Sequence, residues 1–162
     1  MVSALNHSSA LNHSSMLHFS GHEFLRQRLI LSALSGRSVR IDCIRPEGDQ
    51  LGLVDYEASF LRLVDKITNG SSIEINYTGT CITFVPGILS GGKIHHDCPP
   101  SRSIGYFLEV VIALAPFCKN PLTLSLTGIT NDNLDPSVIL SANIIDGFNK
   151  NSDFASIEEI WD

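Results

Sequence analysis

Several features that would assign the chain to a membrane or secretory class are missing. There is no run of 18 apolar residues, so no membrane-spanning helix is expected. The first twenty residues contain no Lys or Arg and no continuous apolar stretch, unlike a secretory signal peptide. The four cysteines form no Cys-x-x-Cys pair. We therefore expect an intracellular protein whose free thiols fill small apolar spaces.

An excess of positive charge is also missing. The net charge is −6. Residues 19–138 contain ten Lys and Arg against twelve Asp and Glu, whereas residues 139–162 contain one Lys against five acids. A nearly neutral body argues against nucleic-acid binding through net charge alone. The exception is a cluster of five arginines within twenty residues: Arg26, Arg28, Arg37, Arg40 and Arg45.

What is present is a globular composition. The chain has 162 residues, of which 43% are hydrophobic and 17% charged, enough for one domain with a real core. Residues 4–9 and 10–15 repeat the same polar hexapeptide, Ala-Leu-Asn-His-Ser-Ser. Low-complexity polar sequence at a terminus is most often disordered, so we expect residues 1–20 to be disordered.

Hydrophobic periodicity predicts three helices and at least four strands. Apolar residues recur at helical spacing in 23–34, 56–67 and 104–115. Alternation predicts strands at 39–45 and 121–128, a hairpin at 73–77 and 80–85, and a possible short strand between Pro86-Gly87 and Gly91-Gly92.

The order of these elements predicts a two-layer α+β fold. A helix followed by a strand occurs in 24–45 and again in 104–128, which suggests a repeat. We divide the chain into a first αβαββ unit at 21–98, the start of a second unit at 99–138, and a divergent acidic tail at 139–162.

A set of short motifs, in this order along residues 19–138, resembles one known family, the RNA 3′-terminal phosphate cyclases, and within it the non-catalytic, cyclase-like branch. The motifs are Phe-Leu-Arg-Gln-Arg-Leu at 24–29, Leu-Ser-Gly at 34–36, Ile-Arg at 44–45, Lys-Ile-Thr-Asn-Gly-Ser at 66–71, Gly-Gly at 91–92, Ser-Ile-Gly-Tyr-Phe-Leu-Glu at 103–109, Leu-Ala-Pro-Phe at 114–117 and Gly-Ile-Thr-Asn-Asp at 128–132. The resemblance implies repeated units of two helices on a four-stranded sheet. It also implies a family chain more than twice this long, of which we expect only the N-terminal part here.

The two branches of the family differ in what they do. The cyclases adenylylate a histidine with ATP and close a terminal phosphate into a 2′,3′-cyclic ester. The cyclase-like branch is nucleolar, binds a large GTPase and acts in the small-subunit processome. The cyclases carry the glycine-rich turn Glu-Gly-Gly-Gly-Gln, where residues 19–23 keep only Gly21. Arg26 and Arg45 match two cyclase arginines, whereas Gly48, Tyr56 and Ile112 replace other active-site residues.

These departures favour the cyclase-like branch. We expect no enzyme activity, no catalytic residue, no cofactor and no metal, with Arg26 and Arg45 as possible RNA- or phosphate-contacting residues. The expected function is ribosome biogenesis in the nucleus and nucleolus, through small-subunit pre-rRNA processing. The expected partners are the nucleolar GTPase and the pre-rRNA particle, with direct RNA contact left open and no membrane. The alternatives are ATP-dependent RNA 3′-terminal phosphate cyclase activity and a non-functional or dominant-negative fragment.

Three local predictions accompany this interpretation. The run His95-His96-Asp97-Cys98 contains four potential metal ligands, but neighbouring strand residues face opposite sides, so we favour a strand-end loop. Arg26 lies on a mostly apolar helix and is either functional or paired, with Glu109 as a candidate partner. We expect Arg37 and Arg40 to lie on the solvated surface.

Overall fold

The computed structural model describes residues 16–130 and 132–136, together with the backbone of 155–161. It contains three α-helices, one 3-10 helix and nine strands within these ranges. In chain order they are β1 (Leu17–Ser20), α1 (Leu25–Ser35), β2 (Val39–Asp42), α2 (Asp55–Ile67), β3 (Thr68–Asn69), β4 (Ser72–Ile75), β5 (Ile82–Val85), β6 (Ile88–Leu89), β7 (Gly92–Asp97), α3 (Ile104–Leu114), η1 (Ala115–Phe117), β8 (Leu122–Thr127) and β9 (Ala155–Trp161).

The first sheet has the strand order β1-β2-β5-β4. β1 and β2 run parallel and are joined by α1, whereas β2, β5 and β4 pair antiparallel. The inward residues Val39, Ile41, Ile82 and Phe84 are fully buried. α2 begins with Asp55 and Glu57 in its first turn and ends with Lys66 in its last, charges that suit the helix dipole.

The second sheet repeats the opening motif of the first. β7 and β8 run parallel and are joined by α3, as β1 and β2 are joined by α1. β9 adds a third parallel strand beside β8, with an irregularity in the ladder where Glu158 has no partner between Ile157 and Glu159. The alternating leucines of β8 are fully buried.

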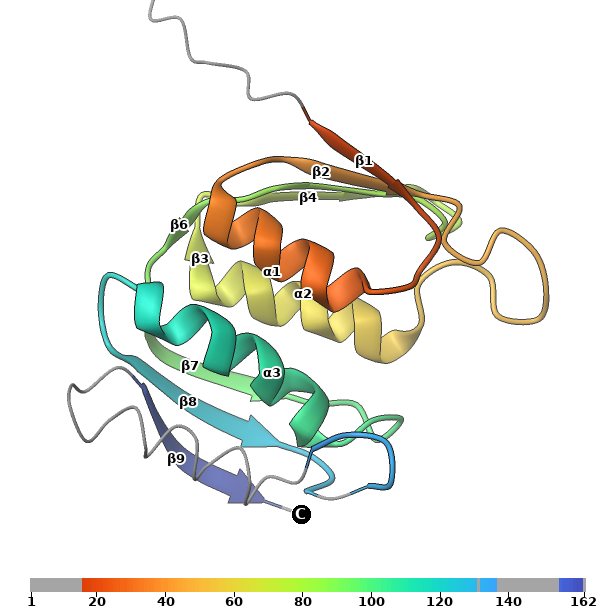
Figure 1. Ribbon diagram of the computed structural model, residues 1–162. Helices are drawn as coiled ribbons and strands as arrows, with labels where there is room; N and C mark the ends of the chain where they lie inside the picture. The colour runs from red at the N-terminus through yellow and green to blue at the C-terminus, as the bar shows by residue number, and fades with distance from the viewer. Residues whose placement is uncertain (1–15, 131, 137–154, 162) are drawn as a thin grey trace, which may run out of the picture.

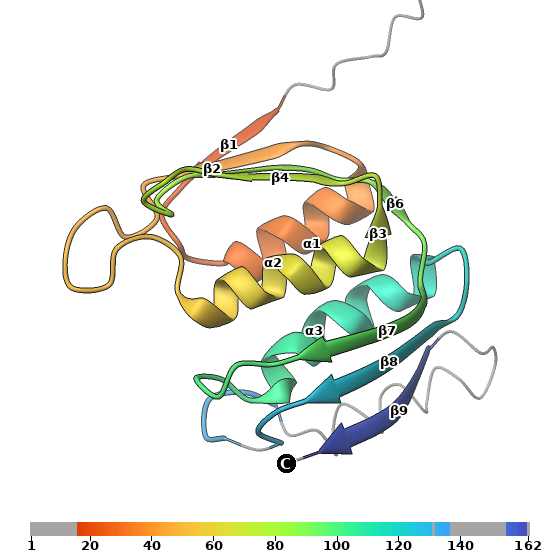
Figure 2. The same cartoon turned by 180° about the vertical axis from the view of Figure 1, so that it is seen from behind.

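The helices lie between the two sheets, as the front and back views agree (Figures 1 and 2). α1 packs on β2 and β5, α2 contacts both β4 and β7, and α3 packs against α1 and α2. The predicted α+β class is therefore confirmed, with α1 and α2 against a four-stranded sheet. β7, which falls in the predicted first unit at 21–98, pairs with β8 in the other sheet. No helix within the described residues has the length and hydropathy of a membrane span.

Two predictions about the ends of the chain need correction. Residues 17–20 were expected to be disordered, but they form β1, because they pair in parallel with Val39–Asp42 of β2 and Leu17 packs against the core. Part of the predicted acidic tail forms β9 against β8. The parts of these two predicted segments at residues 1–15, 139–154 and 162 lie outside the described residues.

Local backbone geometry moves some predicted boundaries. α1 begins two residues later than predicted because Phe24 has a left-handed φ of 56°. β2 ends at Asp42 because Cys43 has a φ of 55°. The predicted loop at 95–98 is wrong for its first three residues, which belong to β7. Of the free cysteines, Cys98 is buried as expected but Cys43 is exposed.

Candidate functional site

Both arginines singled out in the sequence line one cavity of about 500 Å³. The cavity opens where the N-termini of α1 and α2 meet the first turn of α3. Its lining residues are His22, Glu23, Phe24, Leu25, Arg26, Gln27, Arg45, Tyr56, Glu57, Arg102 and Tyr106. We call it the arginine pocket.

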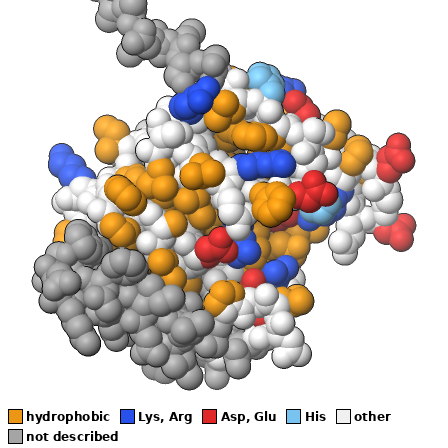
Figure 3. Space-filling model, in the orientation of Figure 1, with side chains coloured by type: hydrophobic (Ala, Val, Ile, Leu, Met, Phe, Trp, Pro, Cys, Tyr) orange, Lys and Arg blue, Asp and Glu red, His pale blue; other side chains and the backbone are white. Residues whose placement is uncertain are grey.

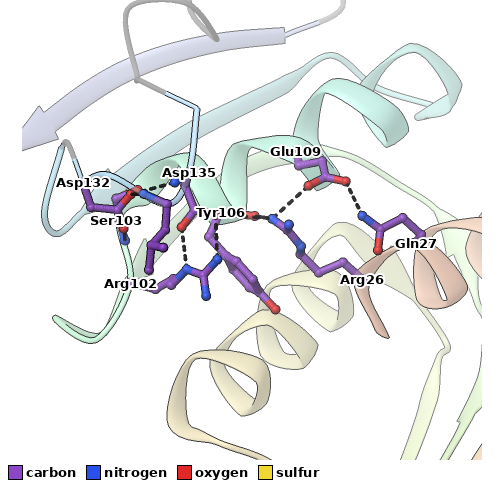
Figure 4. Close-up of polar contacts among 9 residues, drawn as sticks. Arg26, Gln27, Arg102, Ser103, Tyr106, Glu109, Asp132 and Asp135 are labelled. Carbon is purple, nitrogen blue, oxygen red and sulfur yellow. Dashed lines mark hydrogen bonds and ion pairs between the residues drawn. The ribbon is translucent and has the colours of Figure 1, made fainter. Parts of the chain in front are cut away.

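Arg26 enters the pocket from the first turn of α1. Its Nη1 lies 2.8 Å from Oε2 of Glu109 and donates to the Tyr106 carbonyl oxygen at 3.1 Å. Gln27 donates to the other Glu109 oxygen at 2.9 Å (Figure 4). The predicted pairing of Arg26 with Glu109 is therefore confirmed, and it joins α1 to α3 across 82–83 residues of sequence.

Arg45 enters the pocket from the loop that precedes α2. Its two terminal nitrogens each donate to a different Glu57 oxygen at 2.8 Å, a bidentate ion pair, and Nη1 also donates to the Gly52 carbonyl at 3.1 Å. The hydrogen bond to Glu57 raises the pKa of Arg45. Because Glu57 also accepts a hydrogen bond from the Val54 backbone at 3.2 Å, the same carboxylate caps α2.

A third arginine, Arg102, lines the pocket and was not predicted from the sequence. Arg102 precedes α3 and makes two hydrogen bonds with Asp135, Nε at 2.6 Å and Nη2 at 3.1 Å. These hydrogen bonds raise the pKa of Arg102. Asp132 accepts from the Ser103 backbone at 3.1 Å and fixes the same loop against α3. The partner of Arg102 is 33 residues distant in sequence, so spacing alone carried no signal for it.

Tyr106 lies at the centre of these groups. The guanidinium carbon of Arg26 is 4.0 Å from the centre of its ring, and that of Arg102 is 5.1 Å away (Figure 4). The Tyr56 ring meets it edge-on at 5.1 Å. Burial raises the pKa of Tyr106, so its phenol stays protonated at neutral pH. Each guanidinium is attracted to the ring by a cation–π interaction, which helps to position both arginines beside Tyr106.

Each pocket arginine is paired with a carboxylate, but two of these carboxylates do not line the cavity. Glu109 and Asp135 pair Arg26 and Arg102 from outside the lining, where three arginines meet two glutamates, Glu23 and Glu57. A guanidinium has five N–H donors, and these contacts use only part of them. The arrangement can therefore accept an anion beside aromatic rings.

The rim of the pocket carries an unusual residue, Phe24. Its left-handed φ of 56° is rare for a bulky side chain, and the side chain is 72% exposed. Strain of this kind clusters at functional sites, so Phe24 is a candidate contact residue that the sequence did not indicate.

Residues 17–150 match the family model described as RNA 3′-terminal phosphate cyclase. The chain belongs to the RNA 3′-terminal phosphate cyclase family. It is 59% identical over 120 residues to the RNA 3′-terminal phosphate cyclase-like protein of Mus musculus, covering 74% of this chain and 32% of that one. It is 46% identical over 133 residues to an rRNA processing protein of Schizosaccharomyces pombe (82% and 37%) and 45% identical over 120 residues to one of Saccharomyces cerevisiae (74% and 33%). The chain thus spans about a third of the length of these relatives.

The other family positions considered in the sequence lie at different depths. Tyr56 lines the pocket, Gly48 lies in the loop before α2, and Ile112 is half-buried on α3. Arg40 lies outside the pocket and pairs with Asp42 at 3.0 Å.

The two neighbouring histidines of β7 also lie away from the pocket. His96 is buried and bonded to Ser59 at 2.9 Å, whereas His95 pairs with Asp97 at 3.2 Å on the other face. The described residues contain no group of three or more His, Cys, Asp or Glu placed to hold a metal ion.

Proposed function

We propose that this chain belongs to a non-catalytic, cyclase-like protein that acts in ribosome biogenesis, in the processing of small-subunit pre-rRNA. The proposal includes a direct contact between the arginine pocket and RNA. It is supported by family membership and by the two fungal relatives, both named as rRNA processing proteins.

The observation that carries the RNA contact is the grouping of Arg26, Arg45 and Arg102 around Tyr106 and Tyr56. Arginines that keep spare donors hold phosphate oxygens, and RNA bases stack on aromatic rings and guanidinium planes. A volume of about 500 Å³ suits one or two nucleotides of a single strand better than a duplex. Because each pocket arginine is already paired with a carboxylate, we expect the binding of RNA to be weak and salt-sensitive.

The absence of turnover is supported by the turn at residues 19–23. A glycine-rich turn lets the backbone approach a phosphate closely, but here His22 and Glu23 add side chains, and both line the pocket. The Glu23 carboxylate disfavours ATP, which carries several negative charges, more strongly than an RNA phosphodiester, which carries one. The internal pairing of every pocket arginine also favours a fixed binding surface over one that must stabilise new charge in a transition state.

The cellular setting follows from the same proposal. A protein of small-subunit processing would work in the nucleolus and the nucleus, beside the GTPase that the family resemblance implies as a partner. We propose neither a cofactor nor a membrane partner for this protein.

The test is ultraviolet crosslinking of the tagged chain in cells that express it, followed by sequencing of the attached RNA. We expect reads enriched in small-subunit pre-rRNA, and a loss of about tenfold with Arg102→Ala, from one lost charge-assisted contact. Arg40→Ala is the matched control, since Arg40 pairs with Asp42 outside the pocket. Equal crosslinking by all three chains, or reads without pre-rRNA, would overturn the proposal.

A further inference from the structure

A second concave surface lies at the other end of α1. It has a volume of about 700 Å³ and is lined by Ala33, Leu34, Ser35, Gly36, Gly87, Ile88, Leu89, Phe117 and Lys119. We call it the apolar groove. Leu34 lies eight residues after Arg26, so about 12 Å of helix separates the groove from the arginine pocket.

The groove exposes large apolar side chains. Ile88 is 72% exposed and Phe117 is 64% exposed, and Leu31, one turn before Leu34 on α1, is 63% exposed. Figure 3, in the orientation of Figure 1, shows hydrophobic side chains gathered over α1 and the end of the molecule where α1 stops. Contiguous apolar surface on a folded protein marks a contact with another macromolecule.

The walls of the groove are rigid. Ile88 pairs with Asn69 in the β3–β6 ladder, and Lys119 donates its backbone N–H to the Leu89 carbonyl at 2.9 Å. A Cβ on Gly87 would lie 2.3 Å from the Asn69 carbonyl oxygen, so the backbones are in direct contact. The exposed side chains therefore stand on a preformed surface, and binding there costs little ordering entropy.

The hydrogen bonds also restrict the kind of occupant. The carbonyls of Leu89 and Ser90 already accept from the backbones of Lys119 and Asn120, so this side of β6 is closed to an added strand. Recognition must then use side chains. Leu31 and Leu34 are spaced by one turn of α1, and such a ridge beside a groove fits the apolar face of a second helix.

The charge of the groove restricts the occupant further. Among the described residues that line it, Lys119 is the one charged residue and none is a carboxylate. We propose that the apolar groove docks an amphipathic helix of a partner protein, with its apolar residues on Leu34, Ile88 and Phe117 and an acidic flank beside Lys119. This site is distinct from the arginine pocket and does not depend on RNA binding.

The test uses the full 162-residue chain, isotope-labelled, and two synthetic amphipathic helices as probes. Both carry leucines on one face. One has glutamates at its flanks, and its twin has lysines. We expect saturable NMR shifts at Leu34, Ile88 and Lys119 with the acidic helix, at an affinity about fivefold higher than with the basic one. The Arg26 and Tyr106 signals should not move.

Variants sharpen this test. Ile88→Asp should abolish the shifts, whereas Ile75→Asp, an equally drastic change at an exposed residue of β4, should leave them intact. Lys119→Glu should reverse the preference between the two helices. Unchanged spectra of the remaining signals show that each variant is folded.

Three results would overturn the proposal. The first is the absence of saturable shifts with either helix, or equal affinity for both. The second is a concentration-dependent dimer that Ile88→Asp dissociates, because a second copy of the chain would then be the occupant. The third is displacement of the acidic helix by a single-stranded RNA, because the groove would then bind nucleic acid.

Discussion

The two parallel strand–helix–strand motifs, β1–α1–β2 and β7–α3–β8, follow the same path but bury their helices differently. Both helices have 11 residues, and eight of them are buried in α3 against five in α1. α3 lies between its own sheet and the other two helices (Figures 1 and 2) and contacts α1 and α2, whereas Leu31 and Leu34 of α1 remain exposed. The helix of the β7–α3–β8 motif is therefore mainly part of the core, whereas the helix of the β1–α1–β2 motif also forms part of the surface.

The difference explains where the two candidate sites lie. The N-terminal end of α1 contributes Arg26 to the arginine pocket, and its C-terminal end contributes Leu34 to the apolar groove. α3 takes part in the pocket only through its first turns, where Tyr106 and Glu109 hold Arg26. Because one face of α1 is exposed, residues at both of its ends can line candidate binding sites, while the residues of its buried face stabilise the fold.

We expect the largest effect from a substitution in the buried helix α3. Phe107→Ala removes a fully buried ring from α3 and should lower the free energy of unfolding by about 3–5 kcal/mol. Leu31→Ala on the exposed side of α1 should change it by about 0.5 kcal/mol or less. Urea unfolding followed by circular dichroism compares the two. Similar losses for both variants would show that α1 is as covered as α3.

The next effect concerns the ion pair at the pocket. Glu57→Gln leaves the guanidinium of Arg45 mostly buried without its bidentate partner and should cost about 3 kcal/mol of unfolding free energy. Asp42→Asn breaks the exposed pair with Arg40, which solvent screens, and should lower the free energy of unfolding far less. The double change of Arg45→Met with Glu57→Leu should recover most of the loss. A small loss for Glu57→Gln would mean that water reaches the pair.

A smaller effect is the pH dependence of stability that a buried histidine of the β7–α3–β8 motif introduces. His96 on β7 is 3% exposed, and burial lowers its pKa from 6.5 to about 4. Between pH 6.5 and pH 4, His96 is protonated in the unfolded chain but not in the folded chain. The free energy of unfolding therefore falls by about 1.4 kcal/mol for each unit that the pH is lowered in this range. Unfolding titrations at pH 6.5 and pH 5 measure the slope. His96→Gln should reduce the slope by this amount, and an unchanged slope would assign it to other groups.

The sequence predicted most of the helices and strands because their apolar periodicity was clear, as in α2 and β8. It failed where the fold depends on partners distant in sequence. β1 is short and mostly exposed, and it is held by its ladder with β2. β9 contains Glu158 and Glu159, which obscure its alternation, and it forms only beside β8.

Only part of the arginine pocket could be predicted from the sequence. Arg26 and Arg45 were found through the family resemblance, and the pairing of Arg26 with Glu109 was anticipated from their helices. Arg102 was missed because its role depends on Asp135 and on the approach of α3 to α1. The left-handed backbone of Phe24 could not be predicted, because bulky residues ordinarily avoid this conformation and no sequence pattern marks it.

The most direct test of binding without turnover combines the chain with ATP and a single-stranded RNA that carries a 3′-phosphate. Fluorescence anisotropy measures binding, and chromatography of the RNA detects the cyclic ester. The account predicts salt-sensitive binding that Arg102→Ala weakens about tenfold, with neither a cyclic ester nor an adenylylated protein. A 2′,3′-cyclic product, or a covalent adenylate on the chain, would contradict it.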